Sequence, residues 1–335
     1  MPIIDGHGGT DNIFYHSRQL FFKGFHANEL CAYHELHRET VCSPIVNGVL
    51  FFAVPVAGHL DCFLVAYDNK IELVEWNTLT NLPGRKLAAM TEVDLQKNEF
   101  INSGTGDPFG GVCFWTLRMS EPVFGKVWTF GAVSFPSLLE QHRLVGLRVS
   151  NGILWDLTHI ERIYCVDGLS NRIMSFTYNL AEKKFTGFTG IAFDLNAWIE
   201  SLEHPLYTGH AMLGRMTIDT NGRIWVPLNG GSHVLQIDPV SRGVLQAIAF
   251  RAVRVTACVF GGEKLNILYV SSIPYGGDAA PVGDQGGKIF AVTGLGEGVK
   301  GREAWPYHMP ETFMRQRNSM YMHTPKHNSK GIPYV

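Results

Sequence analysis

Residues 219–239 read DTNGRIWVPLNGGSHVLQIDP, and this stretch decides the fold class. Residues 219–222 (DTNG) and 229–231 (NGG) consist of the small and polar residues that form tight turns. Residues 223–227 and 232–237 are short runs rich in Ile, Val, Leu and Trp, as expected for strands. Two such strands joined by a tight turn form an antiparallel pair. The stretch therefore predicts part of a small antiparallel sheet.

The same pairing of short apolar strands recurs in five other parts of the chain. The pairs are residues 17–22 with 29–33, 47–52 with 62–67, 107–117 with 125–130, 162–166 with 172–178, and 265–271 with 287–292. Six units in 335 residues leave about 56 residues for each unit, too few to bury both faces of its own sheet. Stacking the units around an axis solves this problem. We predict an all-β fold, a six-bladed β-propeller of four-stranded antiparallel blades, with a β-sandwich as the alternative.

Composition and charge narrow the class of partner and the cellular location. The chain is 45% hydrophobic and 17% charged and contains 36 Gly, which favours many short strands over helices. A net charge of −2 without a basic stripe predicts no nucleic-acid partner. The longest apolar run, residues 48–58, is too short to cross a bilayer. We expect no membrane association, no secretory signal, a cytoplasmic protein, and six buried free cysteines, with three disulfides as the alternative.

Four stretches resemble the regucalcin/gluconolactonase family. They are residues 149–155 with 163–170, 216–239, 256–262 and 286–296, and the similarity runs from about residue 8 to about residue 307. The resemblance implies one propeller over residues 1–308, with its chemistry on a small molecule at one mouth of the central channel. We expect residues 309–335 to form a tail that packs on or across the propeller. A homodimer is left open.

The resemblance also implies a divalent cation, held by a Glu of blade 1, an Asn of blade 4 and an Asp of blade 5 that doubles as the general base. Asn151 matches the blade 4 ligand. The position of the blade 5 Asp is Gly214 here, and the blade 1 Glu falls at Gly9, with Asp11 two residues away. We therefore expect no metal of the family type and no other cofactor.

The six predicted mouth positions are Gly9 or Asp11, Cys42, Asn102, Asn151, Gly214 and Thr256. Asn102 matches a substrate-contacting Asn of the family, with Phe100 in place of a neighbouring Arg. The predicted catalytic residues are Asn102, Asn151, His210 and Arg215. The predicted substrate-binding residues are Cys42, Phe100, Trp115, Trp155, Thr256 and Arg254. The alternatives are core positions for both tryptophans and a solvated rim position for Arg254.

A mouth of neutral donors, small residues and aromatic rings suits a larger and more hydrophobic substrate than a sugar lactone. We predict a cofactor-free enzyme that guides the cyclisation or cycloaddition of a reactive organic intermediate, similar to the hetero-Diels–Alder propellers of fungal secondary metabolism. Positioning and hydrogen bonds to a carbonyl would suffice for this chemistry. One alternative is a metal-dependent lactonase or esterase, with Asp11, Asp107 or Asp167 as ligands. The other is a non-catalytic propeller that binds a small molecule.

Overall fold

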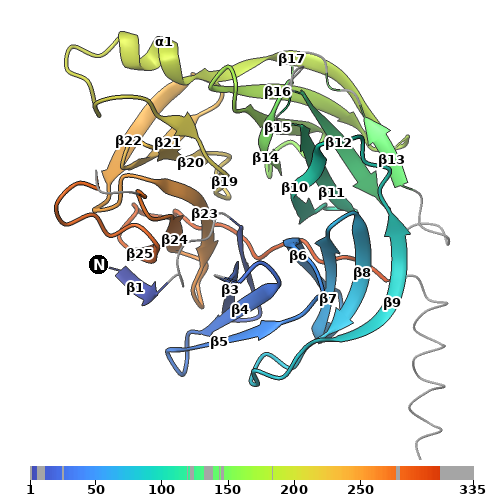
Figure 1. Ribbon diagram of the computed structural model, residues 1–335. Coiled ribbons are helices and arrows are strands. Elements are labelled where there is room, and N and C mark those ends of the chain that lie inside the picture. The colour runs from blue at the N-terminus through green and yellow to red at the C-terminus, as the bar shows by residue number, and fades with distance from the viewer. Residues whose placement is uncertain are drawn as a thin grey trace, which may run out of the picture.

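The computed structural model describes residues 2–5, 12–24, 26–118, 120, 124–131, 139–142, 144, 147–182, 184–276 and 280–309. These residues form six antiparallel sheets around a central channel, which confirms the predicted six-bladed propeller (Figure 1). A short helix, α1 (Leu195–Glu200), links blades 4 and 5. No helix in these ranges is long and apolar enough to span a membrane.

Each blade runs outward from an inner strand beside the channel to an outer strand at the rim. Blade 1 consists of β2 (Ile13–His16), β3 (Gln19–Lys23), β4 (Glu29–His34) and β5 (Glu39–Pro44). Blade 2 consists of β6 (Leu50–Val56), β7 (His59–Tyr67), β8 (Lys70–Glu75) and β9 (Arg85–Glu92). Blade 3 consists of β10 (Glu99–Gly106), β11 (Val112–Arg118), β12 (Phe124–Phe130) and β13 (Leu139–His142). Blade 4 consists of β14 (Ser150–Trp155), β15 (Arg162–Asp167), β16 (Arg172–Asn179) and β17 (Lys184–Asp194). Blade 5 has an inner strand in two parts, β18 (Met212–Leu213) and β19 (Thr217–Ile218), followed by β20 (Ile224–Asn229), β21 (His233–Asp238) and β22 (Gly243–Ala249). Blade 6 consists of β23 (Val255–Gly261), β24 (Ile267–Ser272), β25 (Lys288–Val292) and β1 (Pro2–Asp5).

The strand pairs predicted from the sequence are present, and most are the middle two strands of a blade. The stretch at residues 219–239 contains β20 and β21, which pair from Ile224↔Ile237 to Leu228↔His233. Middle strands are the easiest to recognise because they are buried on both faces and therefore apolar throughout. Their burial supports the ring: Phe114, Trp128 and Phe130 of blade 3 pack with Phe52 of blade 2 in one of several clusters between blades.

The ring closes in blade 6, where the N-terminal strand β1 joins the sheet formed by β23, β24 and β25. Strand β1 pairs antiparallel with β25, at Ile4↔Ile289 and Asp5↔Lys288. The N-terminal strand therefore forms the outer edge of the last blade, beside strands from the other end of the ring.

One expectation about the cysteines is wrong. Cys31 of β4 and Cys42 of β5 lie directly opposite each other and form a disulfide bond. The other cysteines, Cys62, Cys113, Cys165 and Cys258, are free and buried, as expected. The sequence offered no means of pairing two of six cysteines, because the bond depends on the register between β4 and β5.

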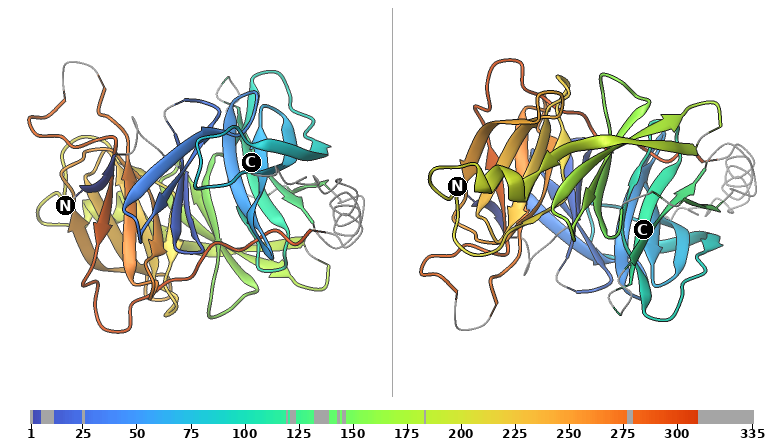
Figure 2. Two further views of the ribbon diagram at one scale, coloured as in Figure 1. Left: turned by 90° about the horizontal axis from the view of Figure 1, so that it is seen from below. Right: turned by 90° about the horizontal axis from the view of Figure 1, so that it is seen from above.

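Residues 301–309, which we call the strap, run across one face of the propeller (Figure 2). Backbone amides of Ala304, Tyr307 and His308 donate to the carbonyls of Tyr15, Pro55 and Gly110 in blades 1, 2 and 3, at 2.8 Å each. These carbonyls lie near the hairpins that follow the inner strands. We call this side the strap face and the opposite side, where the inner strands begin, the mouth face. Residues 310–335, on which most of the predicted tail falls, lie outside the described residues.

Candidate functional site

Irregularities in the inner strands mark one level of the channel near the mouth face. The pairing of inner and second strands shifts register at Phe51 in β6, Asn102 in β10, Asn151–Gly152 in β14 and Thr256 in β23. In blade 5 the inner strand is interrupted between β18 and β19, at residues 214–216. A bulge turns a residue out of the ladder and changes the direction of its side chain. Four of the predicted mouth positions, Asn102, Asn151, Gly214 and Thr256, lie at this level.

Asparagine side chains at this level join neighbouring blades. Asn102 Nδ2 donates to the Ser150 carbonyl at 3.4 Å, and Asn151 Nδ2 donates to the Leu213 carbonyl at 2.7 Å. Asn12, immediately before β2, donates in the same way to the Phe51 carbonyl. Each amide thus bonds the inner strand of the next blade. The nitrogen atoms of Asn102 and Asn151, predicted to donate to a substrate, are engaged in structural hydrogen bonds.

Gly214 sits where the backbones of blades 5 and 6 approach most closely. The amide of Gly214 donates to the Pro227 carbonyl, and the amide of Arg215 donates to the Thr256 carbonyl, both at 2.8 Å. A Cβ atom on residue 214 would lie 2.3 Å from the Thr256 carbonyl oxygen. Real Cβ atoms do not approach backbone oxygens this closely, so the place of a blade 5 carboxylate is filled by the neighbouring blade.

The carboxylates of the lactonase alternative have other partners. Both oxygens of Asp167 are occupied, Oδ1 by the amides of Arg148 and Val149 and Oδ2 by Ser170. Asp107 Oδ1 accepts from the amides of Phe109 and Gly111 in the hairpin after β10. Both residues therefore shape turns. Asp11 and Gly9 lie outside the described residues.

The described residues do not fit a divalent cation at the level of the asparagines. Hard cations need several oxygen ligands that include carboxylate. At this level the described side-chain oxygens are amide or hydroxyl oxygens, and Gly214 offers no room for a carboxylate. Elsewhere in the described chain, His59, Asp61 and Cys62 bring three possible ligand atoms within 4.8 Å of one another. This group lies at the start of β7, close to the strap face, and is separate from the mouth.

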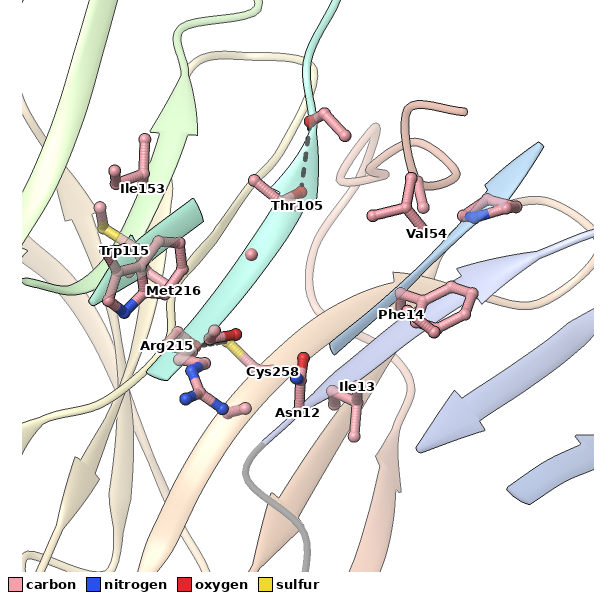
Figure 3. Close-up of a pocket in the computed structure, with 18 residues that line it drawn as sticks. Asn12, Ile13, Phe14, Val54, Thr105, Trp115, Ile153, Arg215, Met216 and Cys258 are labelled. Carbon is pink, nitrogen blue, oxygen red and sulfur yellow. Dashed lines mark hydrogen bonds between the residues drawn. The ribbon is translucent and has the colours of Figure 1, made fainter. Parts of the chain in front are cut away.

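The channel below the asparagines holds a small cavity of about 100 Å³. The side chains of Trp115, Arg215 and Asn12 reach it from blades 3, 5 and 1 (Figure 3). Trp115 is buried, and its Nε1–H has no acceptor among the described residues. At roughly 30 Å³ for each water molecule, the cavity suits a few waters and is too small for two joined reactants.

A second cavity, of about 140 Å³, lies between the first cavity and the strap. Trp155 lines it and is buried, so this residue lies at the closed end of the channel, far along β14 from the mouth. Arg302 of the strap faces the same space, and burial lowers the pKa of its guanidinium to about 9, against an opposing effect of Glu303. Residues 302–305 of the strap therefore form one wall of this cavity, at the strap-face end of the channel.

A groove of about 890 Å³ lies on the mouth face, between blades 5 and 6. We call it the rim groove. Ligand pockets commonly measure about 300–1,000 Å³. The predicted residues His210 and Arg254 both line the groove, together with His233, Tyr207 and Tyr275. Burial raises the pKa of the half-buried Tyr207, which stays a neutral hydroxyl donor at physiological pH.

The remaining residues of the predicted site, Phe100, Thr256 and Cys42, lie in different parts of the propeller. Phe100 is exposed on the mouth side and stacks on Phe51, with ring centres 6.4 Å apart. Thr256 is buried, and its hydroxyl faces Ser271 of β24 at 3.2 Å. Cys42 is in the outermost strand of blade 1, bonded to Cys31, and its predicted mouth position was wrong. The inner strand of the next blade begins only at Leu50, and Phe51 occupies the mouth level there.

Three residues near the mouth were not predicted from the sequence as site residues: Asn12, Phe51 and Asn229. Asn12 could have been identified, because, like Asn102 and Asn151, it is an asparagine near the start of an inner strand. Phe51 lies within a recognised strand and gives no separate signal. Asn229 belongs to the Asn-Gly-Gly turn, and its Oδ1 accepts from Arg254 Nε at 3.3 Å, a contact made only when blades 5 and 6 are stacked.

Comparison with known proteins agrees with the fold. Residues 13–274 match the family described as SMP-30/Gluconolactonase/LRE-like region. Regucalcin of Danio rerio is 30% identical over 248 residues, covering 73% of this chain and 76% of that protein. Regucalcin of Sus scrofa is 27% identical over 297 residues, covering 87% and 91%.

Solved structures show the same architecture. A luciferin-regenerating enzyme aligns with a TM-score of 0.79 at 20% identity, covering 92% of this chain and 97% of the other. The calcium-binding protein regucalcin of Agrobacterium tumefaciens aligns with a TM-score of 0.73 at 18% identity over the same shares of the two chains. The matched residues span five complete blades and reach into the sixth. The chain therefore belongs to the SMP-30/gluconolactonase/LRE-like family of β-propellers.

Proposed function

We propose that this propeller is a metal-independent enzyme that binds a small, reactive organic intermediate on the mouth face and guides its cyclisation or cycloaddition. The family includes enzymes, as the name of the luciferin-regenerating enzyme indicates. The observation that carries the proposal is the packing at Gly214, where the Thr256 carbonyl fills the place of a ligating and proton-accepting carboxylate. Chemistry that depends on a metal-bound water and a blade 5 base has no support from these residues.

The rim groove offers what a concerted ring closure needs. Its walls include Leu206, Met212 and Tyr275, which would hold apolar reactants side by side. Holding two reacting groups in near-attack geometry replaces a bimolecular encounter, and well-oriented systems gain up to about 7–11 kcal/mol in this way. Arg254 and His210 are the donors that would bond a carbonyl of the heterodiene, and one well-placed donor contributes about 3 kcal/mol.

The proposal is tested with a generated ortho-quinone methide and a terpene alkene, the reactant pair that the resemblance suggests. The protein is expected to give an enantiomerically enriched adduct by chiral chromatography, with the same rate after treatment with EDTA. Arg254→Gln is expected to reduce the enrichment. An identical racemic product with and without protein would contradict the proposal.

Two further outcomes identify the alternatives. Hydrolysis of gluconolactone that depends on added Ca²⁺, Mg²⁺ or Zn²⁺ would show a lactonase. Saturable binding of the reactants without any change in rate or product would show a non-catalytic binding propeller.

A further inference from the structure

We infer that the rim groove selects an organic anion, an apolar molecule that carries one acidic group, and that Arg254 is its anchor. This inference rests on the proposed function and deepens it by naming the class of molecule that the groove admits. Three features of the groove support it: the way Arg254 is held, the balance of charges around it, and the apolar walls.

Arg254 is held in place by two weak hydrogen bonds that leave most of its donors available. Nε donates to Asn229 Oδ1 at 3.3 Å, and one terminal nitrogen donates to the Pro274 carbonyl at 3.4 Å. Neither partner carries a charge. A guanidinium has five N–H donors, and its fork matches the two oxygens of a carboxylate or the oxygens of a phosphate. The three remaining N–H groups have no acceptor among the residues that the structure describes.

The described lining of the rim groove places no acidic side chain beside Arg254. The described residues that line the groove include no Asp or Glu, and they include two histidines, His210 and His233. His233 Nδ1 lies 2.7 Å from the Gly231 carbonyl and therefore carries the proton. A nearby carboxylate, Asp284, accepts hydrogen bonds from the backbone amides of Val253 and Gly286 and does not line the groove. A half-buried cation without an opposite charge is the common feature of anion sites.

The groove also exposes apolar side chains that a purely polar ligand would leave in water. Met212 is 47% exposed and Tyr275 is 37% exposed, and both line the groove with Leu206. The combination of one fixed cation with apolar walls is complementary to a ring system bearing one acidic group. A free sugar lactone, which is neutral and hydrophilic, satisfies neither feature.

The experiment compares two fluorescent probes that differ by one charge. 8-Anilino-1-naphthalenesulfonate carries a sulfonate, and N-phenyl-1-naphthylamine has the same aromatic body without it. We expect the anionic probe to bind the full-length protein more tightly, with its Kd raised about tenfold by Arg254→Gln and by less than that by Arg254→Lys. The Kd of the neutral probe is expected to change less than twofold. Arg251→Gln, an exposed neighbour that does not line the groove, is the matched control.

A second pair of variants keeps the test decisive if Arg254→Gln unfolds. Met212→Glu places a negative charge at an exposed position of the groove and is expected to bind the anionic probe about tenfold more weakly than Met212→Gln, which makes the same change from an apolar to a polar side chain without the charge. Equal affinities of the two probes for the unaltered protein, or equal losses of both in the Arg254 and Met212 variants, would overturn the inference. The experiment measures binding and not catalysis, so the two ideas can fail separately. If the protein binds the anionic probe selectively but changes neither the rate nor the product of the test reaction, the inference holds and the proposed function is wrong.

Discussion

The close approach of Gly214 to the Thr256 carbonyl shows how a residue without a side chain can take a structural role between blades. The absence of a side chain lets the amides of residues 214 and 215 bond the backbones on both sides at 2.8 Å. Asn102 and Asn151 are likewise polar residues at positions where the family resemblance implies a binding site. Their side-chain amides donate hydrogen bonds to the next blade and so hold neighbouring blades together. The mouth is thus built from residues that stabilise the ring.

Gly214→Asp, which introduces the carboxylate that the family resemblance implies, is expected to destabilise the protein without creating a metal site. Overpacking commonly costs about 1–3 kcal/mol, and here the obstacle is backbone, which cannot rotate away. Thermal unfolding and calcium titration by calorimetry check both parts. Gly214→Ala should be destabilised too, because the Cβ alone makes the contact. Calcium binding by Gly214→Asp with an unchanged Tm would contradict this account.

Glu99 is expected to make the free energy of unfolding depend on pH in the acid range. Its side chain is fully buried and receives hydrogen bonds from Lys126 at 2.8 Å and from Thr116. Burial acts to raise the pKa of Glu99, but these bonds and one from the Gln96 amide hold the pKa below its usual value. A lowered folded pKa means that the stabilisation is complete above the unfolded pKa of about 4.3 and is lost as the pH falls through the folded pKa.

Urea denaturation between pH 6 and pH 3 is therefore expected to show a steeper loss of stability for the unaltered protein than for Glu99→Gln. At neutral pH, Lys126→Met should cost about 3–5 kcal/mol, because it leaves a buried carboxylate without a counter-charge. The double variant Glu99→Gln/Lys126→Met should recover part of that loss. Equal acid profiles for the unaltered protein and Glu99→Gln would show that other carboxylates dominate.

At the scale of elements, cross-links and bridges compensate for blades that are small on their own. The Cys31–Cys42 bond ties the two outer strands of blade 1, and the strap ties blades 1, 2 and 3 through backbone hydrogen bonds. Tyr307 of the strap is fully buried, stacked on Phe130 with ring centres 5.8 Å apart. The strap is therefore part of the core as well as the floor of the channel.

Removing the disulfide with Cys31→Ser/Cys42→Ser is expected to lower the free energy of unfolding by about 3 kcal/mol. A bond across an 11-residue separation restricts the unfolded chain by roughly that amount. Urea denaturation with and without a reductant is the measurement. Reductant should shift the unaltered protein toward the variant and leave the variant unchanged. A variant as stable as the oxidised protein would contradict the prediction.

At the scale of the whole molecule, the propeller is a closed ring. Strand β1 completes blade 6 by pairing with β25, and the strap lies at the end of the channel opposite the rim groove. Each blade keeps its inner edge at the channel and its outer edge at the rim.

Deleting residues 1–5 is expected to leave β25 as an unpaired edge, which lowers the Tm and promotes association between copies. Light scattering and thermal unfolding measure the two effects. Addition of the excised segment as a synthetic peptide should restore part of the Tm, because it supplies the missing backbone donors and acceptors. A monomer with an unchanged Tm would show that β1 contributes nothing to closure.

Much of the fold could be predicted because strong local patterns agree with the global arrangement. The middle strands, such as β20 and β21, are buried on both faces and have continuous apolar runs. Inner strands were harder to recognise, since β10 reads EFINSGTG and alternates exposed and buried residues beside the channel. Of the site, the positions of Asn102, Asn151, Gly214 and Thr256 followed from the family resemblance. Their hydrogen-bond partners in other blades did not.

The sequence by itself determined the fold class, the number of blades and the absence of a side chain at residue 214, because these depend on local pattern and residue type. Only the tertiary structure decided that Thr256 fills the place beside Gly214, that Cys31 pairs with Cys42, and that the strap lies at one end of the channel. It also brought Arg254 and His210 into one groove. The physical reason is that each of these features joins residues of different strands or blades, and their distances are set by packing around the ring.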